Sequence, residues 1–297
     1  MTTASRPVSP VFFDLSARVK LRVSGADAFR FLNGQLTNNA GKAREDSAIQ
    51  ASVLTAKGKL SAHVFVSKKN GDFILDADPE LREELPARLD RYIIADDVQI
   101  EDVTEKFSVF HVLADAVPTV AGSTRVVIAN RFGFAGWDVW SPAADTETIR
   151  EELRHDMPFC DESGAEVLRI EQGIPRWGRE LTSEIIPVEA NLEESSIDYD
   201  KGCYIGQEVV SRMKMSGQTN KRLCGLVSLS GAPLHPETRL TRESEPGKDA
   251  GWITSAAKSE GLGKEIALGY VKRGHNTIGT RLQAGDVPVE VVALPFS

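Results

Sequence analysis

Hydrophobic and polar residues alternate along several short segments, which is the pattern of strands with one buried face. Residues 19–23, Val-Lys-Leu-Arg-Val, alternate strictly and predict a half-buried strand. Asn70-Gly71 lies between two apolar runs and predicts a tight hairpin turn. Strands are predicted in this way at residues 19–23, 49–54, 60–66, 73–75, 98–103, 108–113, 125–129 and 137–140.

Apolar residues at four-residue spacing predict a helix among these strands. Leu81, Leu85 and Leu89 follow Asp78-Pro79, a helix entry with Asp as the cap and Pro in the first turn. Residues 47–120 are therefore predicted to be strands around one helix, which is an α+β unit. Two further helices are predicted, one from Asp27 and one over residues 146–154.

A fourth helix is predicted just before a loop rich in Gly and Pro. Residues 163–166, Ser-Gly-Ala-Glu, fit a capping box at its start. Gly173 ends the periodic pattern, so Glu171 is predicted to lie at the helix C-terminal end.

After residue 215 the helical pattern disappears. Short apolar runs alternate with Gly-rich and Pro-rich connections, which is typical of a small all-β domain. The predicted strands are residues 222–229, 251–255, 266–271 and 287–294.

Length and charge narrow the class of protein. The 297 residues are enough for two or three packed domains. The formal net charge of -8 argues against a large nucleic-acid footprint, because an acidic surface repels phosphates. No apolar run approaches the roughly 20 residues that span a bilayer. The first ten residues contain no secretory signal, and we expect a cytoplasmic location.

The chain contains three cysteines, Cys160, Cys203 and Cys224. Their odd number and wide spacing argue against a disulfide framework and agree with a reducing compartment. Three cysteines cannot supply a four-thiolate cluster or zinc site within one chain. No metal site is predicted, because none of the five histidines pairs with another at metal-ligand spacing.

Residues 201–208, Lys-Gly-Cys-Tyr-Ile-Gly-Gln-Glu, form the segment most suggestive of chemistry, which we call the signature segment. Gly202 and Gly206 permit conformations or close approaches that a side chain blocks. A helix is predicted from Gln207, and a Cys near a helix N-terminus and beside Lys201 should have a lowered pKa. Cys203 is then a nucleophile, a metal ligand or a redox group. The alternative is a small buried hydrophobic residue on a tight turn.

The signature segment resembles the Lys-Gly-Cys-Tyr-x-Gly-Gln-Glu motif of the YgfZ folate-binding family, which is related to the glycine cleavage T-protein. Further short matches occur in the order of the family and are spread over nearly the whole chain. They lie at residues 15–16, 31–38, 169–176, 210–214 and 220–222.

The resemblance implies an α+β fold in which three domains form a ring around a folate cavity. It predicts two α+β domains and a small C-terminal β-barrel. The expected division is a discontinuous folate-binding domain at residues 1–46 and 121–215, an inserted domain at 47–120, and the barrel at 216–297.

The resemblance also implies a site for tetrahydrofolate or a derivative. Glu171, in an Arg-x-Glu-x-Gly segment, is expected to bind the pterin, because a carboxylate can accept two parallel N–H bonds from it. Arg212 and Lys214, with Lys221 and Arg222, form a basic cluster suited to the polyglutamate tail or an anionic partner. The expected folate residues are Glu171, Arg176, Trp177, Tyr204, Gln207, Arg212 and Lys214, and the expected catalytic residues are Cys203 and Lys201.

One departure separates the chain from T-proteins. Where these have Gly-x-Leu-Asp-Asp, with an Asp that serves aminomethyl transfer, residues 58–62 are Gly-Lys-Leu-Ser-Ala. Neither Ser61 nor Ala62 can replace a carboxylate. The resemblance therefore predicts a protein that binds tetrahydrofolate and supports iron–sulfur cluster assembly or repair in client enzymes, including tRNA-modifying ones, with Cys203 as its functional thiol.

Two alternatives remain open from the sequence. One is a folate-dependent aminomethyl or C1 transferase, and the other is a non-catalytic scaffold for iron–sulfur carrier proteins. The expected partners are folate and iron–sulfur carrier or client proteins, with no direct nucleic-acid contact and no membrane contact.

Overall fold

The computed structural model describes residues 9–123, 125–242 and 247–297. These residues form two compact units. We call residues 9–161 and 193–211 the N-terminal unit, and Glu162–Leu192 with Arg212–Ser297 the barrel unit. Among the described helices, none combines the length and apolar character needed to cross a membrane.

The N-terminal unit contains a five-stranded antiparallel sheet in the order β3-β4-β5-β2-β6. Asn70 and Gly71, both at positive φ, turn the chain between β4 and β5, so the predicted hairpin is confirmed. The strands are β2 (Val19–Ser24), β3 (Ile49–Leu54), β4 (Leu60–Lys69), β5 (Asp72–Ala77) and β6 (Gln99–Asp102).

A second antiparallel sheet of the same unit has the order β1-β7-β9-β8. Its strands are β1 (Val11–Asp14), β7 (Phe107–Leu113), β8 (Arg125–Asn130) and β9 (Ala135–Pro142). Ser47, just before β3, forms a parallel bridge with Ile128 of β8, which links the two sheets.

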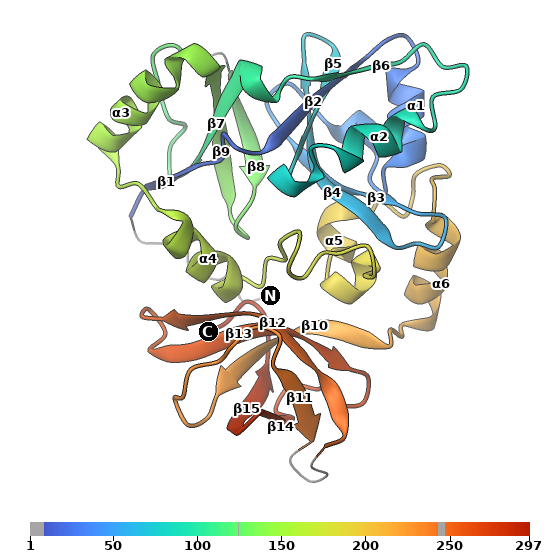
Figure 1. The fold of residues 1–297 in the computed structure, drawn as a ribbon. Helices are drawn as coiled ribbons and strands as arrows, with labels where there is room; N and C mark the ends of the chain where they lie inside the picture. Colours follow the sequence, from blue (N-terminus) through green and yellow to red (C-terminus); the bar gives the residue numbers. More distant parts are fainter. Residues whose placement is uncertain (1–8, 124, 243–246) are drawn as a thin grey trace. The chain divides into compact units, whose positions relative to one another are not determined.

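Short helices accompany these sheets. Helix α2 packs against β4 and β6, and α3 packs against β9 (Figure 1). The α-helices are α1 (Ala28–Gln35), α2 (Glu84–Asp90), α3 (Thr146–Asp156), α4 (Glu162–Glu171), α5 (Glu193–Ser196) and α6 (Gln207–Ser216). The 3-10 turns are η1 (Ala40–Lys42), η2 (Pro79–Leu81), η3 (Thr104–Lys106), η4 (Ala143–Asp145) and η5 (Pro187–Ala190).

Two predicted helix starts are wrong in detail. The segment after Asp78 divides into η2 and α2, although its three leucines are buried as predicted. Asp78 lies at the N-cap of η2 and Pro79 in its first turn, as predicted. The Asp78 carboxylate makes no capping hydrogen bond, however, and instead accepts one from Arg18 Nη1 at 2.7 Å. Helix α4 begins at Glu162, one residue before Ser163, so Ser163 does not lie at the predicted capping position.

Strand β2 also departs from strict alternation. Lys20 was expected on a solvent-facing side, but its side chain is fully buried. Its ammonium group donates to the carbonyl oxygens of Ser16 at 2.6 Å and Arg18 at 2.9 Å. Desolvation by burial lowers the pKa of Lys20 to about 8.

A buried ionic cluster joins the two sheets of the N-terminal unit. Arg131 donates from Nη2 to Asp76 of β5 at 2.9 Å and to Asp138 of β9 at 2.6 Å. Although burial acts to raise it, Arg131 holds the pKa of Asp138 well below its usual range. Since both carboxylates share one guanidinium, the sheets are held in a fixed relation within this unit.

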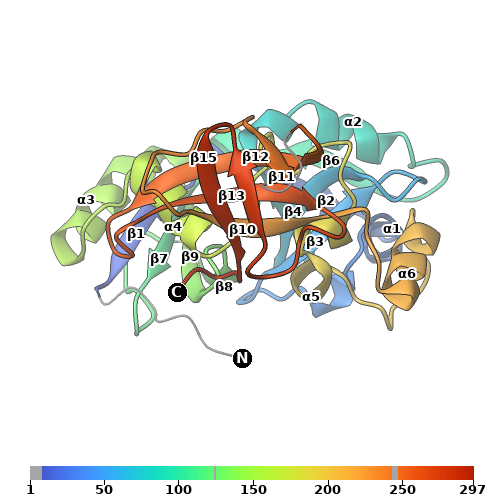
Figure 2. The ribbon, with the colours of Figure 1, turned by 90° about the horizontal axis from the view of Figure 1, so that it is seen from below.

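The barrel unit contains a closed six-stranded antiparallel barrel, drawn in orange and red in Figures 1 and 2. The predicted all-β character of this region is confirmed. In the barrel order, the strands are β10 (Lys221–Ser228), β13 (Lys264–Lys272), β12 (Asp249–Ser259), β11 (Arg239–Arg242), β14 (Arg281–Ala284) and β15 (Val287–Val292). The prediction missed β11 and β14, which have four residues each.

The predicted division into three domains stays a prediction. Its boundary between residues 46 and 47 falls inside the five-stranded sheet, because β2 pairs with β5 and β6. Its boundary at residue 120 separates β7 from β9, which pair along their length.

Candidate functional site

The signature segment caps helix α1. The Lys201 ammonium group donates to the carbonyl oxygens of Asn33 and, at 2.7 Å, Leu36. The Ile205 amide donates to the Gly34 carbonyl at 3.1 Å. Carbonyls in the last turn of a helix lack intrahelical donors, and a cation is favourable at this negative end. The segment thus satisfies the end of a helix that lies far away in the sequence.

Lys201 is buried by these contacts. Desolvation lowers its pKa to about 8, although Asp198 acts in the opposite direction. Its Nζ atom also lies 5.0 Å from the ring centroid of Tyr204. Tyr204 is buried as well, and burial raises its pKa to about 12. These contacts make Lys201 an anchor of the segment, and its catalytic assignment stays a prediction.

Cys203 is a free, exposed cysteine. Gly202 beside it is also exposed, and a Cβ added there would meet no atom within 4 Å. The alternative of a buried hydrophobic residue is therefore wrong. The other two cysteines differ, since Cys160 is half-buried and Cys224 is buried with its pKa raised to about 11 by desolvation.

The two glycines of the signature segment have different roles. Gly206 adopts φ +85°, and a Cβ there would lie 2.7 Å from the Thr55 carbonyl oxygen. The requirement for glycine is confirmed at this position. It is wrong for Gly202, whose φ is not positive and whose surroundings are open. Gly58 faces the same region, because a Cβ on it would lie 2.7 Å from Val209 Cβ.

Gln207 begins α6 as predicted, and its Oε1 atom accepts a hydrogen bond from the Tyr204 amide at 3.4 Å. Arg212 and Lys214 follow on α6 and are exposed. The structure thus brings Lys201, Cys203, Tyr204 and Gln207 together within the N-terminal unit.

Two residues of the predicted basic cluster are held by the barrel unit itself. Lys221 forms an ion pair with the buried Glu189 at 3.0 Å. Arg222 Nε donates to Asn191 Oδ1 at 2.7 Å. Lys221 and Arg222 therefore each have a polar partner within the barrel unit.

Glu171 is the last residue of α4, as predicted, and it is half-buried. Its Oε1 atom accepts a hydrogen bond from Ser259 Oγ at 2.5 Å, and its carbonyl accepts one from the Phe296 amide at 2.8 Å. Ser259 Oγ in turn accepts from the Leu262 amide at 3.0 Å. The carboxylate is therefore oriented by β12 and the chain end of the same unit.

A buried ion pair fixes α4 on the barrel. Arg169 Nη1 donates to Glu180 Oε2 at 3.0 Å, and Arg169 Nη2 donates to Ser255 Oγ of β12 at 2.6 Å. Ser255 Oγ also donates to Glu180 Oε1 at 2.6 Å. Glu180 is fully buried, so this charge depends on its partners.

Arg176 and Trp177 lie in the loop between Arg169 and Glu180. Arg176 approaches Glu166 at 3.5 Å and Glu162 at 3.6 Å, both on α4. Trp177 is half-buried and forms a bridge with Leu181 that closes the loop. The structure thus groups Glu171, Arg176 and Trp177 within the barrel unit.

A third group was not predicted as part of a site. Thr37 Oγ1 donates to the Ser196 carbonyl at 2.5 Å, and Thr37 O accepts from the Asp198 amide at 3.1 Å. His63 Nε2 lies 3.1 Å from Ser196 Oγ, and burial lowers the pKa of His63 to about 4. The sequence signal that could have found this group is the family match at residues 31–38, which includes Thr37. In the structure, Thr37 contacts the segment just before Lys201.

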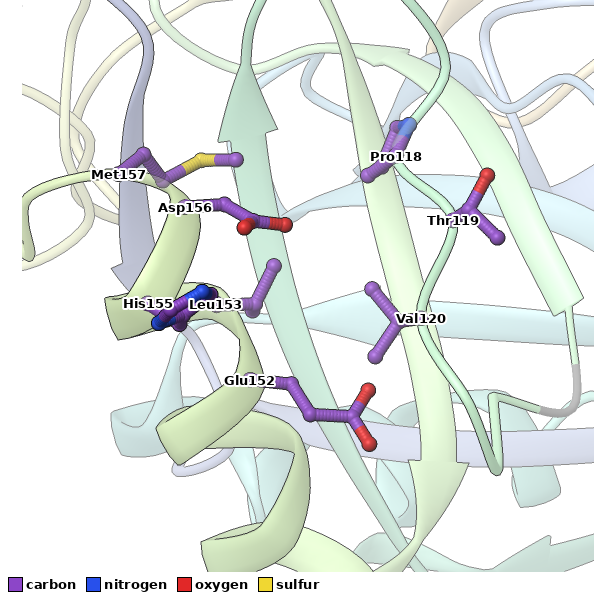
Figure 3. A pocket seen from close by; sticks show the side chains of 8 residues that line it. All are labelled: Pro118, Thr119, Val120, Glu152, Leu153, His155, Asp156 and Met157. Atoms are coloured by element: carbon purple, nitrogen blue, oxygen red, sulfur yellow. The ribbon is translucent and has the colours of Figure 1, made fainter.

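The residues at the T-protein departure lie on β4, where Ala62 is buried and Ser61 is half-buried. Figure 3 shows a different feature of the N-terminal unit, a groove of about 260 Å³ between residues 118–120 and the C-terminal end of α3. Its lining includes Leu153, Met157 and the carboxylates of Glu152 and Asp156, and none of the predicted site residues.

Comparison with known proteins shows which families this chain is similar to. Residues 221–297 match the glycine cleavage T-protein C-terminal barrel domain. The iron-sulfur cluster assembly factor IBA57 homolog, mitochondrial, of Dictyostelium discoideum is 28% identical over 72% of this chain and 61% of that protein. The tRNA-modifying protein YgfZ of Shigella dysenteriae is 25% identical over 87% of this chain and 84% of that protein. This chain is thus similar to the YgfZ and IBA57 proteins and to the T-proteins.

The similarity of this chain to T-proteins extends to the fold. The crystal structure of glycine cleavage system aminomethyltransferase T from Bartonella henselae matches with a TM-score of 0.85. The match covers 97% of this chain and 86% of that chain at 16% sequence identity. The predicted T-protein-like α+β fold with a C-terminal barrel is confirmed.

Proposed function

We propose that this chain belongs to the YgfZ/IBA57 family, binds tetrahydrofolate and supports iron–sulfur cluster assembly or repair in client enzymes, with Cys203 as its functional thiol. The observation that carries the proposal is the exposed Cys203 in a signature segment that the buried Lys201 and Tyr204 hold on either side of it. A reactive thiol must be reached by its partner, whereas a packing cysteine is enclosed, as Cys224 is.

The thiol has three chemical uses in this proposal. As a thiolate it can accept a group from a donor that leaves, bind a cluster iron transiently, or attack a partner's disulfide, which forms a mixed disulfide and releases the partner's other sulfur as a thiolate. Each use requires loss of the Sγ proton, which the exposed position allows solvent to take. Because three cysteines cannot complete a four-thiolate site, a cluster bound as cargo would take its remaining ligands from the carrier or client protein.

The folate part of the proposal places the pterin on Glu171. Each carboxylate oxygen can accept two hydrogen bonds, so the bond from Ser259 leaves acceptor capacity for two pterin N–H groups. Bound tetrahydrofolate supplies one-carbon chemistry. The other folate residues in the proposal are Arg176, Trp177, Tyr204, Gln207, Arg212 and Lys214.

The proposed partners are iron–sulfur carriers and client enzymes, among them tRNA-modifying ones, with cytoplasm as the compartment. The names of the Dictyostelium and Shigella relatives support this role. The acidic net charge of -8 supports action on protein partners with no direct tRNA contact.

The test is rescue of cells that lack this protein, with several iron–sulfur enzyme activities as the readout. We expect wild type to restore these activities and Cys203→Ala to fail, while Cys160→Ala rescues as a matched control. Equal rescue by wild type and Cys203→Ala would leave the scaffold function, in which the thiol has no part. Unchanged activities in the deleted cells would contradict the maturation role itself.

A folate-dependent C1 transferase is the second candidate, because the fold is that of an aminomethyltransferase. Ser61 and Ala62 at the departure argue against it, since neither can act as the missing carboxylate. Turnover of tetrahydrofolate with a methylamine donor by the purified protein would establish this activity, and its absence would remove the candidate.

A further inference from the structure

The exposed Cys203 lies between two anchors that bind the same helix end. On its N-terminal side, Lys201 donates to the carbonyls of Asn33 and Leu36. On its C-terminal side, the Ile205 amide donates to the carbonyl of Gly34. Only Gly202 and Cys203 project between Lys201 and the buried Tyr204.

The anchors make α1 and the signature segment mutually dependent. Without Lys201, the Asn33 and Leu36 carbonyls would lose a charged donor in a buried place, where an unsatisfied carbonyl is unfavourable. Because the same ammonium also lies against the Tyr204 ring, its loss would free both sides of the exposed cysteine. The location of the thiol therefore depends on Lys201 through contacts and not through a bond to sulfur.

We propose that Lys201 is a positioning residue for the Cys203 thiol, which it holds in place by capping α1 and packing on Tyr204. This rests on the proposed function, in which Cys203 is the functional thiol. The competing interpretation is the one made from sequence, in which the positive charge of Lys201 stabilises the thiolate. The two differ in what is lost when Lys201 is replaced.

The experiment compares Lys201→Met and Lys201→Arg with wild type, and uses Lys57→Met as the matched control. Lys57 is an exposed lysine in the turn beside Gly206, so its replacement removes one nearby charge and no helix cap. Two quantities are measured on each purified full-length protein. One is amide hydrogen exchange in peptides that cover residues 33–38 and 202–206, and the other is the pH profile of Cys203 alkylation by iodoacetamide, followed by peptide mass.

For Lys201→Met, positioning predicts exchange at least about tenfold faster in these two peptides, with the rest of the N-terminal unit unchanged. The midpoint of the alkylation profile should stay within about 0.3 pH units of wild type. Lys57→Met should leave both quantities unchanged.

A midpoint raised by about one pH unit with unchanged exchange would overturn the proposal in favour of the charge interpretation. If Lys201→Met does not fold, Lys201→Arg is used to decide between the positioning proposal and the charge interpretation. Positioning then requires faster exchange at residues 33–38, because a bulky guanidinium cannot reproduce the contacts of the ammonium, and wild-type exchange would contradict it. Neither readout depends on cluster assembly. A result of the rescue experiment that contradicts the proposed function can therefore be distinguished from a result here that contradicts the role of Lys201.

Discussion

The signature segment and the segment at residues 169–177 carry the two most specific motifs of the chain, and they surround their chemically important residue differently. Cys203 is exposed, beside the exposed Gly202 and between the buried Lys201 and Tyr204, whereas Glu171 is half-buried and held by Ser259. In both segments the buried cation serves packing. Lys201 caps a helix, and Arg169 joins α4 to the barrel through Glu180.

This difference is the one that the proposed function requires, because it assigns two kinds of chemistry to the two residues. A thiol that must meet another protein needs access, so its support lies on either side of it along the chain. A carboxylate that must match a planar ligand needs a fixed orientation, so its support is a direct hydrogen bond. A motif residue with a charge is therefore not always part of the chemistry, and its burial decides which role it has.

The largest expected effect is loss of the buried ion pair beneath Glu171. Arg169→Met leaves Glu180 as a buried charge without its guanidinium, and we expect the free energy of unfolding of the barrel unit to fall by about 3–5 kcal/mol. Denaturant unfolding measures this loss. Arg176→Met is the matched control, because Arg176 is 38% exposed and its ion pairs should contribute under about 1 kcal/mol. Equal effects of the two variants would contradict a special role for the buried pair.

A smaller effect should separate the two glycines of the signature segment. Gly206→Ala forces a side chain into positive φ and against the Thr55 carbonyl, and we expect a loss of about 1–3 kcal/mol in the N-terminal unit. Gly202→Ala meets no atom and should be neutral or stabilising by up to about 1 kcal/mol. Thermal unfolding of both variants checks which one loses more stability. A larger loss of stability for Gly202→Ala than for Gly206→Ala would contradict the different roles of the two glycines.

The sequence predicted elements best where the signal is local. Strand β3 has its predicted bounds because an apolar run ends at a turn that contains Gly58. Strands β11 and β14 were missed because each has only four residues and begins with Arg, so neither gives a clear alternation. Their pairing partners in the barrel define them, and these lie elsewhere in the chain.

The candidate site shows the same limit. The place of Glu171 at a helix end followed from the periodicity nearby. The sequence left open whether Cys203 is reactive or a buried hydrophobic residue, and its exposure is seen only in the structure. The role of Lys201 did not follow from nearby residues, because its acceptor Asn33 is 168 positions away. Long-range acceptors of a cation leave no pattern in a single sequence. Burial of Lys20 was missed for a different reason. Strict alternation predicts an outward side chain, whereas the nearby carbonyls of Ser16 and Arg18 accept hydrogen bonds from its ammonium group.

The smallest expected effect on stability comes from Glu171→Gln. The same variant is the most direct test of folate binding at Glu171. The amide can still accept the hydrogen bond of Ser259, so unfolding should change by less than about 1 kcal/mol. The charge that the pterin N–H groups would bind is lost, and we expect the Kd for tetrahydrofolate to rise about 10- to 100-fold. Titration calorimetry measures this, with Glu162→Gln at the exposed start of the same helix as the control. An unchanged Kd for Glu171→Gln would mean that the pterin lies elsewhere, and the half-buried carboxylate would then belong to the packing of α4 on the barrel, as Arg169 does.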